Sequence, residues 1–274
     1  MFIIVQGFIL DDFRWSFSRI ETFERCALCF YMQYIQCLKG LPGCFGQFGT
    51  INHDLLEAYA KGELEDYELA NEYKNRYGDV VTEPFPPNKY VDLGDKYYNQ
   101  GLEYFSSFEG FEEFDITGVE EEYEFKIGEY NFVGLIDLET PDSIIDHKTK
   151  GEQHLKRLTK KHNKEDYVQM LDGRYTHKDN WKQLYIYSIP YFVKYKTYPK
   201  FLSLNMVRIN DWYSIEFNEK HFEESQQWVL TQIESIYQTN EFLKGNDVSD
   251  FWCGFVCSQR LNCKHSNSYL GLEQ

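Results

Sequence analysis

Three charged residues stand at the ends of two short apolar runs near the middle of the chain. In "VGLIDLETPDSIIDHKTKG", residues 133–151, the first run ends at Asp137 and the second at Asp146, with Lys148 two residues later. Charged side chains at the ends of buried strands are costly unless they are paired or bound to a metal. These three residues are therefore candidates for chemistry.

A hairpin with its loop at residues 139–142 would bring these groups together. In that register Asp137 lies opposite Ile144 and diagonal to Asp146, and strand alternation puts Lys148 on the same face. Two carboxylates with neutral or carbonyl ligands suit a hard divalent ion such as Mg²⁺ or Mn²⁺. Such an ion activates water and stabilises charge on a phosphate oxygen, and a lysine can assist. A surface hairpin with a salt bridge is the simpler alternative.

Two predicted helices carry further polar groups at helical spacing. His53 and Glu57 lie four residues apart in "FGTINHDLLEAYAKGEL", on one helix face, and a neutral imidazole is a good ligand for Mn²⁺. Gln183 and Tyr187 have the same spacing in "KQLYIYSIPY". Taken singly, a histidine on a helix is more often structural. A Gln–Tyr pair is commonplace in a chain with 22 tyrosines.

Three of the seven cysteines lie within a short polar segment near the C-terminus. Cys253, Cys257 and Cys263 form C-x3-C-x5-C. The N-terminal residues lack the features of a signal peptide, so we expect a cytoplasmic protein with reduced cysteines that act as metal ligands or core residues. Cys37 and Cys44 are expected to be buried, inert packing residues.

Hydrophobic periodicity predicts a single α/β domain without repeats or a long linker. The apolar residues 1–10 are expected to form a first strand or a loosely packed arm, too short to span a bilayer. A capping box at Ser18 and Glu21 predicts the start of the first helix. The other predicted elements are a helix at 48–64, acidic helices within 64–110, three strands within 114–149, a basic connection at 151–166, a helix at 178–195, strands at 200–209 and 212–217, and a helix at 219–244.

The composition of the 274-residue chain excludes some classes of protein. The hydrophobic fraction of 42% and the aromatic fraction of 18% exclude a disordered chain. The net charge of −16 argues against a protein whose whole surface is basic and binds nucleic acid. Basic residues nevertheless cluster near Asp146 in the sequence, which predicts a local basic surface that binds the phosphate backbone of nucleic acid. The alternative is a solvated loop. The basic residues are Lys148, Lys150, Lys156, Arg157, Lys160, Lys161 and Lys164. The acidic runs, including "FEEFDITGVEEEYEF", are expected to face solvent or a partner protein.

Taken together and in this order, the motifs resemble those of the PD-(D/E)xK nucleases of the RecB type. The likeness covers roughly residues 16–265 and is strongest to the CRISPR-associated RecB-like exonucleases and the nuclease domain of AddB. The literal "PD", Pro141-Asp142, is a decoy in the turn. The motifs that carry the resemblance are Gly49-x3-His53, Gly134-x2-Asp137, Asp146-x-Lys148 and Gln183-x3-Tyr187.

The resemblance implies a fold and a role for each motif residue. It implies a restriction-endonuclease-like core at about 114–217, a central mixed sheet flanked by helices, with a helical insertion at about 54–112 and a C-terminal helix and cysteine segment at 219–265. Lys148 would assist the nucleophilic water, and Gln183 and Tyr187 would orient Lys148 and the DNA strand. The His147 side chain is expected on the opposite strand face. The metal ligands would be His53, Asp137, Asp146 and the backbone carbonyl of His147.

The resemblance also implies a second inorganic centre. Many of these nucleases hold an iron–sulfur cluster, [4Fe-4S], with one N-terminal cysteine and a C-terminal trio. The matching positions are Cys26, Cys253, Cys257 and Cys263, with Phe30 at the family's spacing from Cys26. The usual trio is C-x2-C-x5-C, and this chain has one more residue in the first gap, so structural Zn²⁺ is the alternative. Cys29, one helical turn from Cys26, could replace it.

The implied function is a metal-dependent DNA nuclease, an exonuclease on single strands or DNA ends. The alternative is a nucleic-acid- or protein-binding subunit on the same fold, active only within a larger recombination, repair or CRISPR complex. DNA and such protein partners are expected, and a membrane is not. The expected location is the cytoplasm, or the host cytoplasm for a phage-encoded protein.

Overall fold

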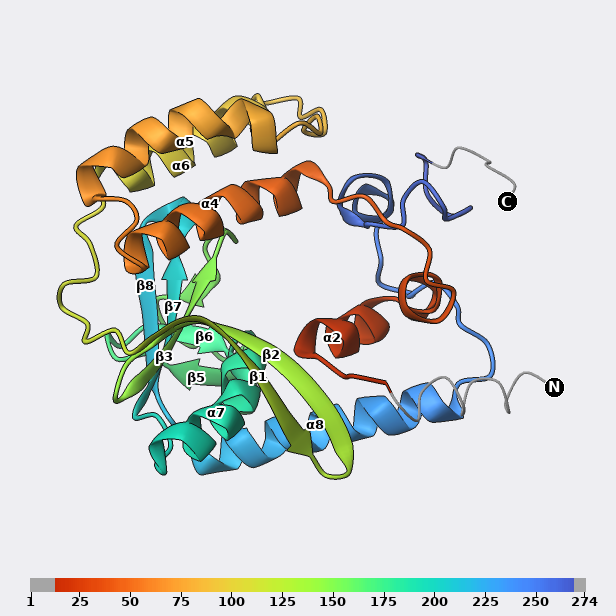
Figure 1. Cartoon of the computed structure of the whole chain (residues 1–274). Coiled ribbons are helices and arrows are strands. Elements are labelled where there is room, and N and C mark those ends of the chain that lie inside the picture. Colours follow the sequence, from red (N-terminus) through yellow and green to blue (C-terminus); the bar gives the residue numbers. More distant parts are fainter. Residues whose placement is uncertain (1–12, 269–274) are drawn as a thin grey trace.

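A five-stranded mixed sheet forms the centre of the protein, with helices on both of its faces (Figure 1). The computed structural model describes residues 13–268, so the strand or arm expected at residues 1–10 lies outside the described residues. Strands β3 and β7 are parallel, and the other neighbours are antiparallel. The predicted fold, a central mixed sheet flanked by helices, is confirmed. In sheet order the strands are β1 (Gly118–Ile127), β2 (Tyr130–Glu139), β3 (Ser143–Lys148), β7 (Phe201–Met206) and β8 (Asp211–Glu216).

Helices cover both faces of this sheet. No helix within residues 13–268 is long and apolar enough to cross a membrane. The flanking helices are α4 (Cys44–Ala60), α5 (Asp66–Val80), α6 (Leu93–Ser106), α7 (Lys182–Tyr195) and α8 (Glu219–Gln238).

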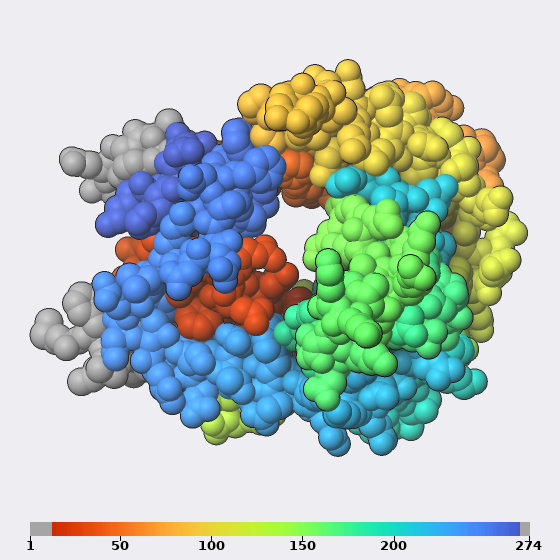
Figure 2. Space-filling model, turned by 180° about the vertical axis from the view of Figure 1, so that it is seen from behind, coloured from red at the N-terminus to blue at the C-terminus, as the bar shows by residue number. Residues whose placement is uncertain are grey.

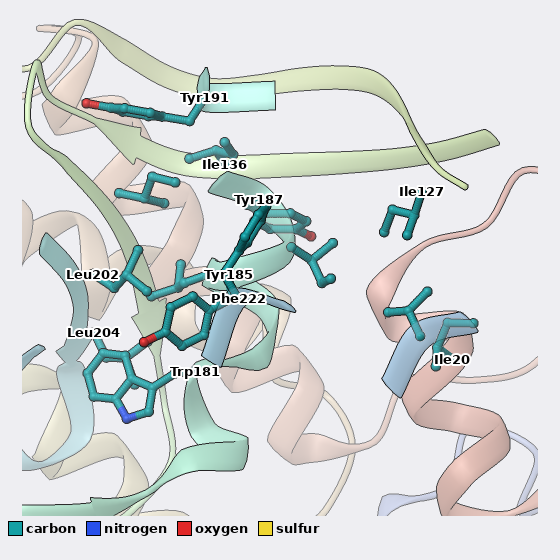
Figure 3. Packing of buried hydrophobic residues seen from close by; sticks show 14 of the residues in the cluster. Ile20, Ile127, Ile136, Trp181, Tyr185, Tyr187, Tyr191, Leu202, Leu204 and Phe222 are labelled. Carbon is teal, nitrogen blue, oxygen red and sulfur yellow. The ribbon is translucent and has the colours of Figure 1, made fainter. Parts of the chain in front are cut away.

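Each face of the sheet has its own hydrophobic core. One core joins the sheet to α7 and α8, and the other joins it to α4, α5 and α6. Successive side chains of a strand point to opposite faces, so Ile144 belongs to the first core and Ile145 to the second. Figure 3 shows Leu202 and Leu204 of β7 beside Trp181, which precedes α7. Because both faces are covered, the first five residues of β3 are buried, although only Ile144 and Ile145 are apolar.

The first helical region is broken at a cysteine rather than continuous. Ser16, not Ser18, caps the first helix: its hydroxyl accepts from the N–H of Arg19 at 3.3 Å. Cys26 has extended backbone angles, φ −159° and ψ 101°, so one helix ends there and the next begins. The single predicted helix was therefore wrong in detail, because periodicity does not reveal a one-residue break. The segments are α2 (Phe17–Arg25), α3 (Ala27–Phe30) and a π-helical turn, Tyr31–Ile35.

A small second sheet was not predicted from the sequence. It lies in and after the basic connection, and its strands are too short to show alternation. The C-terminal helix α8 also ends at residue 238, six residues before the predicted end. The small strands, in the order β4-β6-β5, are β4 (His154–Leu155), β5 (Tyr167–Gln169) and β6 (Tyr175–His177). Short 3₁₀ turns lie at Lys164–Asp166, Lys178–Trp181 and Val207–Ile209, and a second π-helical turn lies at Trp252–Val256.

The hairpin between β2 and β3 has a different register from the predicted one. Glu139, not Asp137, lies opposite Ile144. The ladder consists of this pair and of Leu138 with Ile145, and the side chain of Asp137 then accepts from the N–H of His147. Asp137 still lies close enough to Asp146 for the charge of Asp146, after the effect of burial, to raise the pKa of Asp137. The predicted pairing was wrong, but the two aspartates still meet.

An opening passes through the molecule (Figure 2). The first helices, in orange, and the C-terminal segment, in blue, border one side, and green and cyan segments near residues 150 and 210 border the other. Contacts of the C-terminal segment with the approach to α4 and with the segment after α5 close this ring. Arg260 donates to the carbonyl oxygen of Leu41 at 2.7 Å and forms an ion pair with Glu83 at 2.6 Å.

Candidate active site

The ends of β2 and β3 bring together a histidine, an aspartate and a backbone carbonyl. His53 on α4 has its Nε2 atom 2.9 Å from the carbonyl oxygen of His147 and its Nδ1 atom 3.4 Å from Asp137 Oδ2. The backbone N–H of His147 donates to the same carboxylate oxygen at 2.7 Å. Octahedral bonds of about 2.0–2.1 Å place neighbouring ligand atoms about 3 Å apart. Nε2 of His53 and the carbonyl oxygen of His147 have this spacing, while Asp137 faces the other nitrogen of the ring.

A chain of polar contacts continues from β3 to α7. Lys148 Nζ lies 2.6 Å from Asp146 Oδ2 and donates to Gln183 Oε1 at 2.8 Å. Gln183 Nε2 in turn donates to Tyr187 Oη at 3.4 Å. Gly134 makes room for this tyrosine, because a Cβ there would lie 2.6 Å from Tyr187 Cε1. The structure thus brings these motif residues together.

The charged side chains of the site shift one another's pKa values. Burial alone would lower the pKa of Lys148, but its attraction to Asp146, with help from Asp137, outweighs burial and raises that pKa. Lys148 therefore keeps its proton and acts as a cation. Burial, followed by the charge of Asp146, raises the pKa of Asp137 to about 6, although His53 opposes this. A divalent cation beside Asp137 would favour the ionised carboxylate.

The side chain of His147 points away from Lys148, as expected from strand alternation. Its Nδ1 atom accepts from Asn205 Nδ2 at 3.0 Å, and its ring stacks on Phe111 with a centroid distance of 5.7 Å. Burial, followed by the charges of His53 and Lys148, lowers its pKa well below the usual value. A neutral, fully packed imidazole leaves only the backbone of His147 facing the site.

The structure adds a carboxylate that the sequence did not single out, Glu120 on β1. Ligand atoms of His53, Glu120 and Asp137 all lie within 4.8 Å of one another. Glu120 has φ +50°, in the left-handed region that a glutamate adopts only at a cost of about 1–3 kcal/mol. Burial, followed by the charge of Asp137, raises the pKa of Glu120 to about 7. A strained acidic residue held against two predicted ligands is a further candidate ligand.

The sequence contained one signal that could have identified Glu120. The turn after Ile127 sets the β1–β2 register, in which Val119 pairs with Leu138, so Glu120 falls level with Asp137. The acidic run around it was expected to face solvent or a partner, and for Glu120 this was wrong. Glu57, a weaker candidate on α4, instead forms an ion pair with Lys61.

We expect Glu120→Gln and His53→Ala to weaken Mn²⁺ binding at least about 10-fold, because each removes a strong donor atom. Isothermal titration with Mn²⁺ would measure the affinity, and circular dichroism would check the fold. Glu57→Gln, which removes a carboxylate from the same helix as His53, is the matched control and should bind Mn²⁺ normally. Equal losses in Glu57→Gln and Glu120→Gln would remove Glu120 from the site.

The predicted thiols also come together. Cys29 Sγ lies 3.6 Å from Cys257 Sγ. Cys263 is half-buried, and burial, with the nearby Cys257 and Cys26, raises its pKa. Of the two cysteines expected to be inert packing residues, Cys44 is buried but Cys37 is exposed, so the prediction was wrong for Cys37. The buried members of the group are Cys26, Cys29, Cys253 and Cys257.

Comparison with known proteins agrees with this geometry. A family model described as the PD-(D/E)XK nuclease superfamily matches residues 14–264, and no curated protein matches the chain. The central mixed sheet with flanking helices is consistent with the restriction-endonuclease-like fold of that superfamily. Its members use divalent metals, and a His/Glu/Asp group is present here. The chain belongs to the PD-(D/E)XK nuclease superfamily, whose members bind nucleic acids and are typically phosphodiester hydrolases.

Proposed function

We propose that this protein is a metal-dependent deoxyribonuclease that acts on single strands or DNA ends. The observation that carries the proposal is the convergence of His53, Asp137 and the His147 carbonyl beside the Asp146–Lys148 pair. The ligand set would be completed by Asp146 and Glu120. All donors are oxygens except one imidazole nitrogen, which suits Mg²⁺ or Mn²⁺.

The roles of the side chains follow from their contacts. When bound, the divalent ion supplies a water of lowered pKa and stabilises negative charge on the phosphate. Lys148, held by Asp146 and Gln183, directs its ammonium group towards the attacking water and the developing charge. Tyr187 limits the rotation of Gln183 through their hydrogen bond. The water oxygen forms a bond to phosphorus, the phosphorus–oxygen bond in line with it breaks, and one proton of the water ends on the leaving oxygen.

The opening through the molecule supports a preference for strands with a free end. Lys150, two residues beyond Lys148, is exposed. Its pKa is lowered, first because the surrounding protein displaces water and next because of Lys148, while Glu21 and Arg25 of α2 also act on it. Charged groups of β3 and of α2 therefore both lie near Lys150. A strand that passes through a closed ring must have an end.

The decisive experiment offers the purified protein end-labelled linear DNA and covalently closed single-stranded circles, with Mg²⁺, Mn²⁺ or EDTA. We expect cleavage of linear single strands that requires the metal, and resistance of the circles. Double-stranded DNA with blunt or frayed ends separates strand preference from end preference. Equal cleavage of circles and linear strands would contradict action at ends. Cleavage only after a partner protein is added would favour the subunit alternative.

A local basic surface should bind the DNA despite the net charge of −16. Four exposed cations lie in the segment after β3, and phosphate contacts release counterions whatever the global charge is. Replacing all four by Glu, which reverses their charge, should weaken DNA binding and reduce the dependence of DNA affinity on salt concentration. The affinity for Mn²⁺ should not change. The four residues are Lys156, Arg157, Lys160 and Lys161.

Fluorescence anisotropy over a series of salt concentrations would measure this effect. The matched control reverses four exposed lysines elsewhere, at Lys74, Lys126, Lys196 and Lys200. If both quadruple variants lose the same affinity, the effect reflects net charge alone and the binding surface lies elsewhere.

We propose that the cysteine group holds one structural inorganic centre, preferably [4Fe-4S]. A tetrahedral zinc site with bonds of about 2.3 Å needs sulfur atoms about 3.8 Å apart. The sulfur atoms of Cys29 and Cys257, 3.6 Å apart, have nearly this spacing, so structural Zn²⁺ is the alternative. The extra residue between Cys253 and Cys257 lies in the π-helical turn, where the N–H of Cys257 donates to the Trp252 carbonyl at 2.9 Å. A π-helical turn accommodates one inserted residue, so both thiols stay in the group.

A further inference from the structure

An arginine without a carboxylate partner stands beside the end of the active strand. Strands β3 and β7 are parallel, with Lys148 opposite Met206, so the segments that carry Gly151 and Arg208 leave the sheet together. A Cβ on Gly151 would lie 3.1 Å from Arg208 Nη2, so the missing side chain leaves space for the guanidinium group. In the described part of the chain Arg208 forms no ion pair, and its Nε atom is buried without a hydrogen-bond partner.

Tyr97 on α6 holds this arginine in place. Nη1 of Arg208 donates to Tyr97 Oη at 2.5 Å, and the guanidinium carbon lies 4.3 Å from the centre of the tyrosine ring. A planar cation fixed on an aromatic face loses little entropy when it binds a phosphate. Since its charge is not neutralised by a carboxylate, Arg208 is ready to bind an anion.

A row of aromatic rings continues from Tyr97 to the C-terminal segment. Phe45, at the start of α4, lies 5.3 Å from Tyr97 and 6.2 Å from Phe251, measured between ring centres. Phe251 lies 5.6 Å from Phe255. The exposed fractions of Phe251 and Phe255 are 48% and 37%, so these two rings reach solvent. The row therefore begins at a fixed cation and ends in two exposed aromatic side chains.

The segments that carry the two ends of this row both border the opening. In Figure 2 the cyan segment near residue 210 and the blue segment near residue 250 face each other across it. The row crosses from one to the other through α6 and the start of α4. A strand that enters or leaves the active site through the opening would pass between these two segments.

We propose that Arg208 and the aromatic row form a binding track for single-stranded nucleic acid. Arg208 holds a phosphate next to the one that is cleaved, and bases further along the strand stack on Phe251 and Phe255. Any base can stack on these rings, because every base has a π-face. The track would therefore bind single strands without sequence specificity. The inference rests on the proposed nuclease function, and it adds a path of several nucleotides to the active site.

The test measures binding of fluorescein-labelled oligo(dT) of 4 and 20 nucleotides, with Ca²⁺ in place of Mg²⁺ or Mn²⁺. We expect Phe251→Ala and Phe255→Ala each to weaken binding of the 20-mer about 10-fold and to leave the 4-mer unchanged, because only the longer strand reaches these rings. Arg208→Ala should weaken binding of both and lower the salt slope by about one. Phe192→Ala, which removes a phenylalanine of similar exposure on α7, should change neither.

Two further variants separate stacking from packing. Phe251→Leu keeps the apolar contact with Phe45 but has no π-face, so it should bind the 20-mer as weakly as Phe251→Ala does. Phe251→Tyr keeps the ring and should bind normally. If Phe251→Leu binds the 20-mer with wild-type affinity, the proposed binding track is refuted and the aromatic row serves only for packing. Binding is read without cleavage, so an inactive wild-type protein would count against the proposed function alone.

Discussion

Replacing Asp146 by asparagine should abolish metal-dependent cleavage of DNA while the protein remains folded. Asp146 is buried and holds Lys148 at 2.6 Å, and it is also a proposed metal ligand. Asparagine has nearly the same size and can still accept a hydrogen bond from Lys148, so packing should survive. The lost charge should weaken both metal binding and the position of the lysine. We expect turnover to fall at least about 1,000-fold, which corresponds to roughly 4 kcal/mol in the barrier.

Lys148→Ala should have a similar effect on turnover through the loss of its cation. Rates on end-labelled single strands at saturating Mn²⁺ would measure both variants, and thermal unfolding would check the fold. The matched control is Asp142→Asn. This aspartate belongs to the literal Pro141-Asp142 sequence, but its carboxylate accepts hydrogen bonds from Thr140 and Ser143 in the turn. Near-normal turnover in Asp146→Asn, or an equal loss in Asp142→Asn, would refute the assignment.

Replacing Cys257 by alanine should release the proposed inorganic centre and destabilise the ring around the opening. The thiols join α2 and α3 to the C-terminal segment, which are more than two hundred residues apart in the chain. A centre that holds such distant segments removes much of the entropy of the unfolded chain. We expect a loss of about 3 kcal/mol or more, which lowers the unfolding midpoint by roughly 6–12 °C in a protein of this size.

Metal analysis and calorimetry on anaerobically purified protein would test this expectation. Wild-type protein should be brown with broad visible absorption if iron is bound, and Cys257→Ala should lose iron and stability together. Cys37→Ala removes an exposed thiol and should change neither. If the wild-type protein contains neither iron nor zinc and all its thiols react freely, the thiols are ordinary packing residues.

The active-site hairpin shows how far a pattern in the sequence can be taken. Two apolar runs separated by a short turn predict β2 and β3, and the charged residue at the end of each run predicts a site there. The predicted pairing was wrong by two residues, because the turn is shorter than the expected loop. The site survived the error because the carboxylate of Asp137 still reaches β3, where it accepts from the N–H of His147.

The cysteine group shows a different limit. Spacing identified the C-terminal trio, but the choice of Cys26 as the fourth ligand rested on the family resemblance, with Cys29 one helical turn away as the alternative. The break at Cys26 makes the two backbones different, and Cys29 lies 3.6 Å from Cys257 in the folded chain. The contact joins residues 228 positions apart, so no local pattern could reveal it.

The sequence by itself determined the elements and the chemistry of most of the site. Periods of 3.6 and 2 residues predicted α4, α7 and the central strands, because side-chain direction follows from local geometry. The order and spacing of His53, Asp137, Asp146 and Lys148 resembled the motifs of a nuclease family, and that resemblance implied a metal site. Only the tertiary structure decided that Glu120 joins them, that a ring with an opening forms, and that Arg208 meets a row of aromatic residues. These features depend on strand register, on a strained backbone angle and on contacts between distant segments. The free energies behind them come from packing of the whole chain, which a local pattern does not contain.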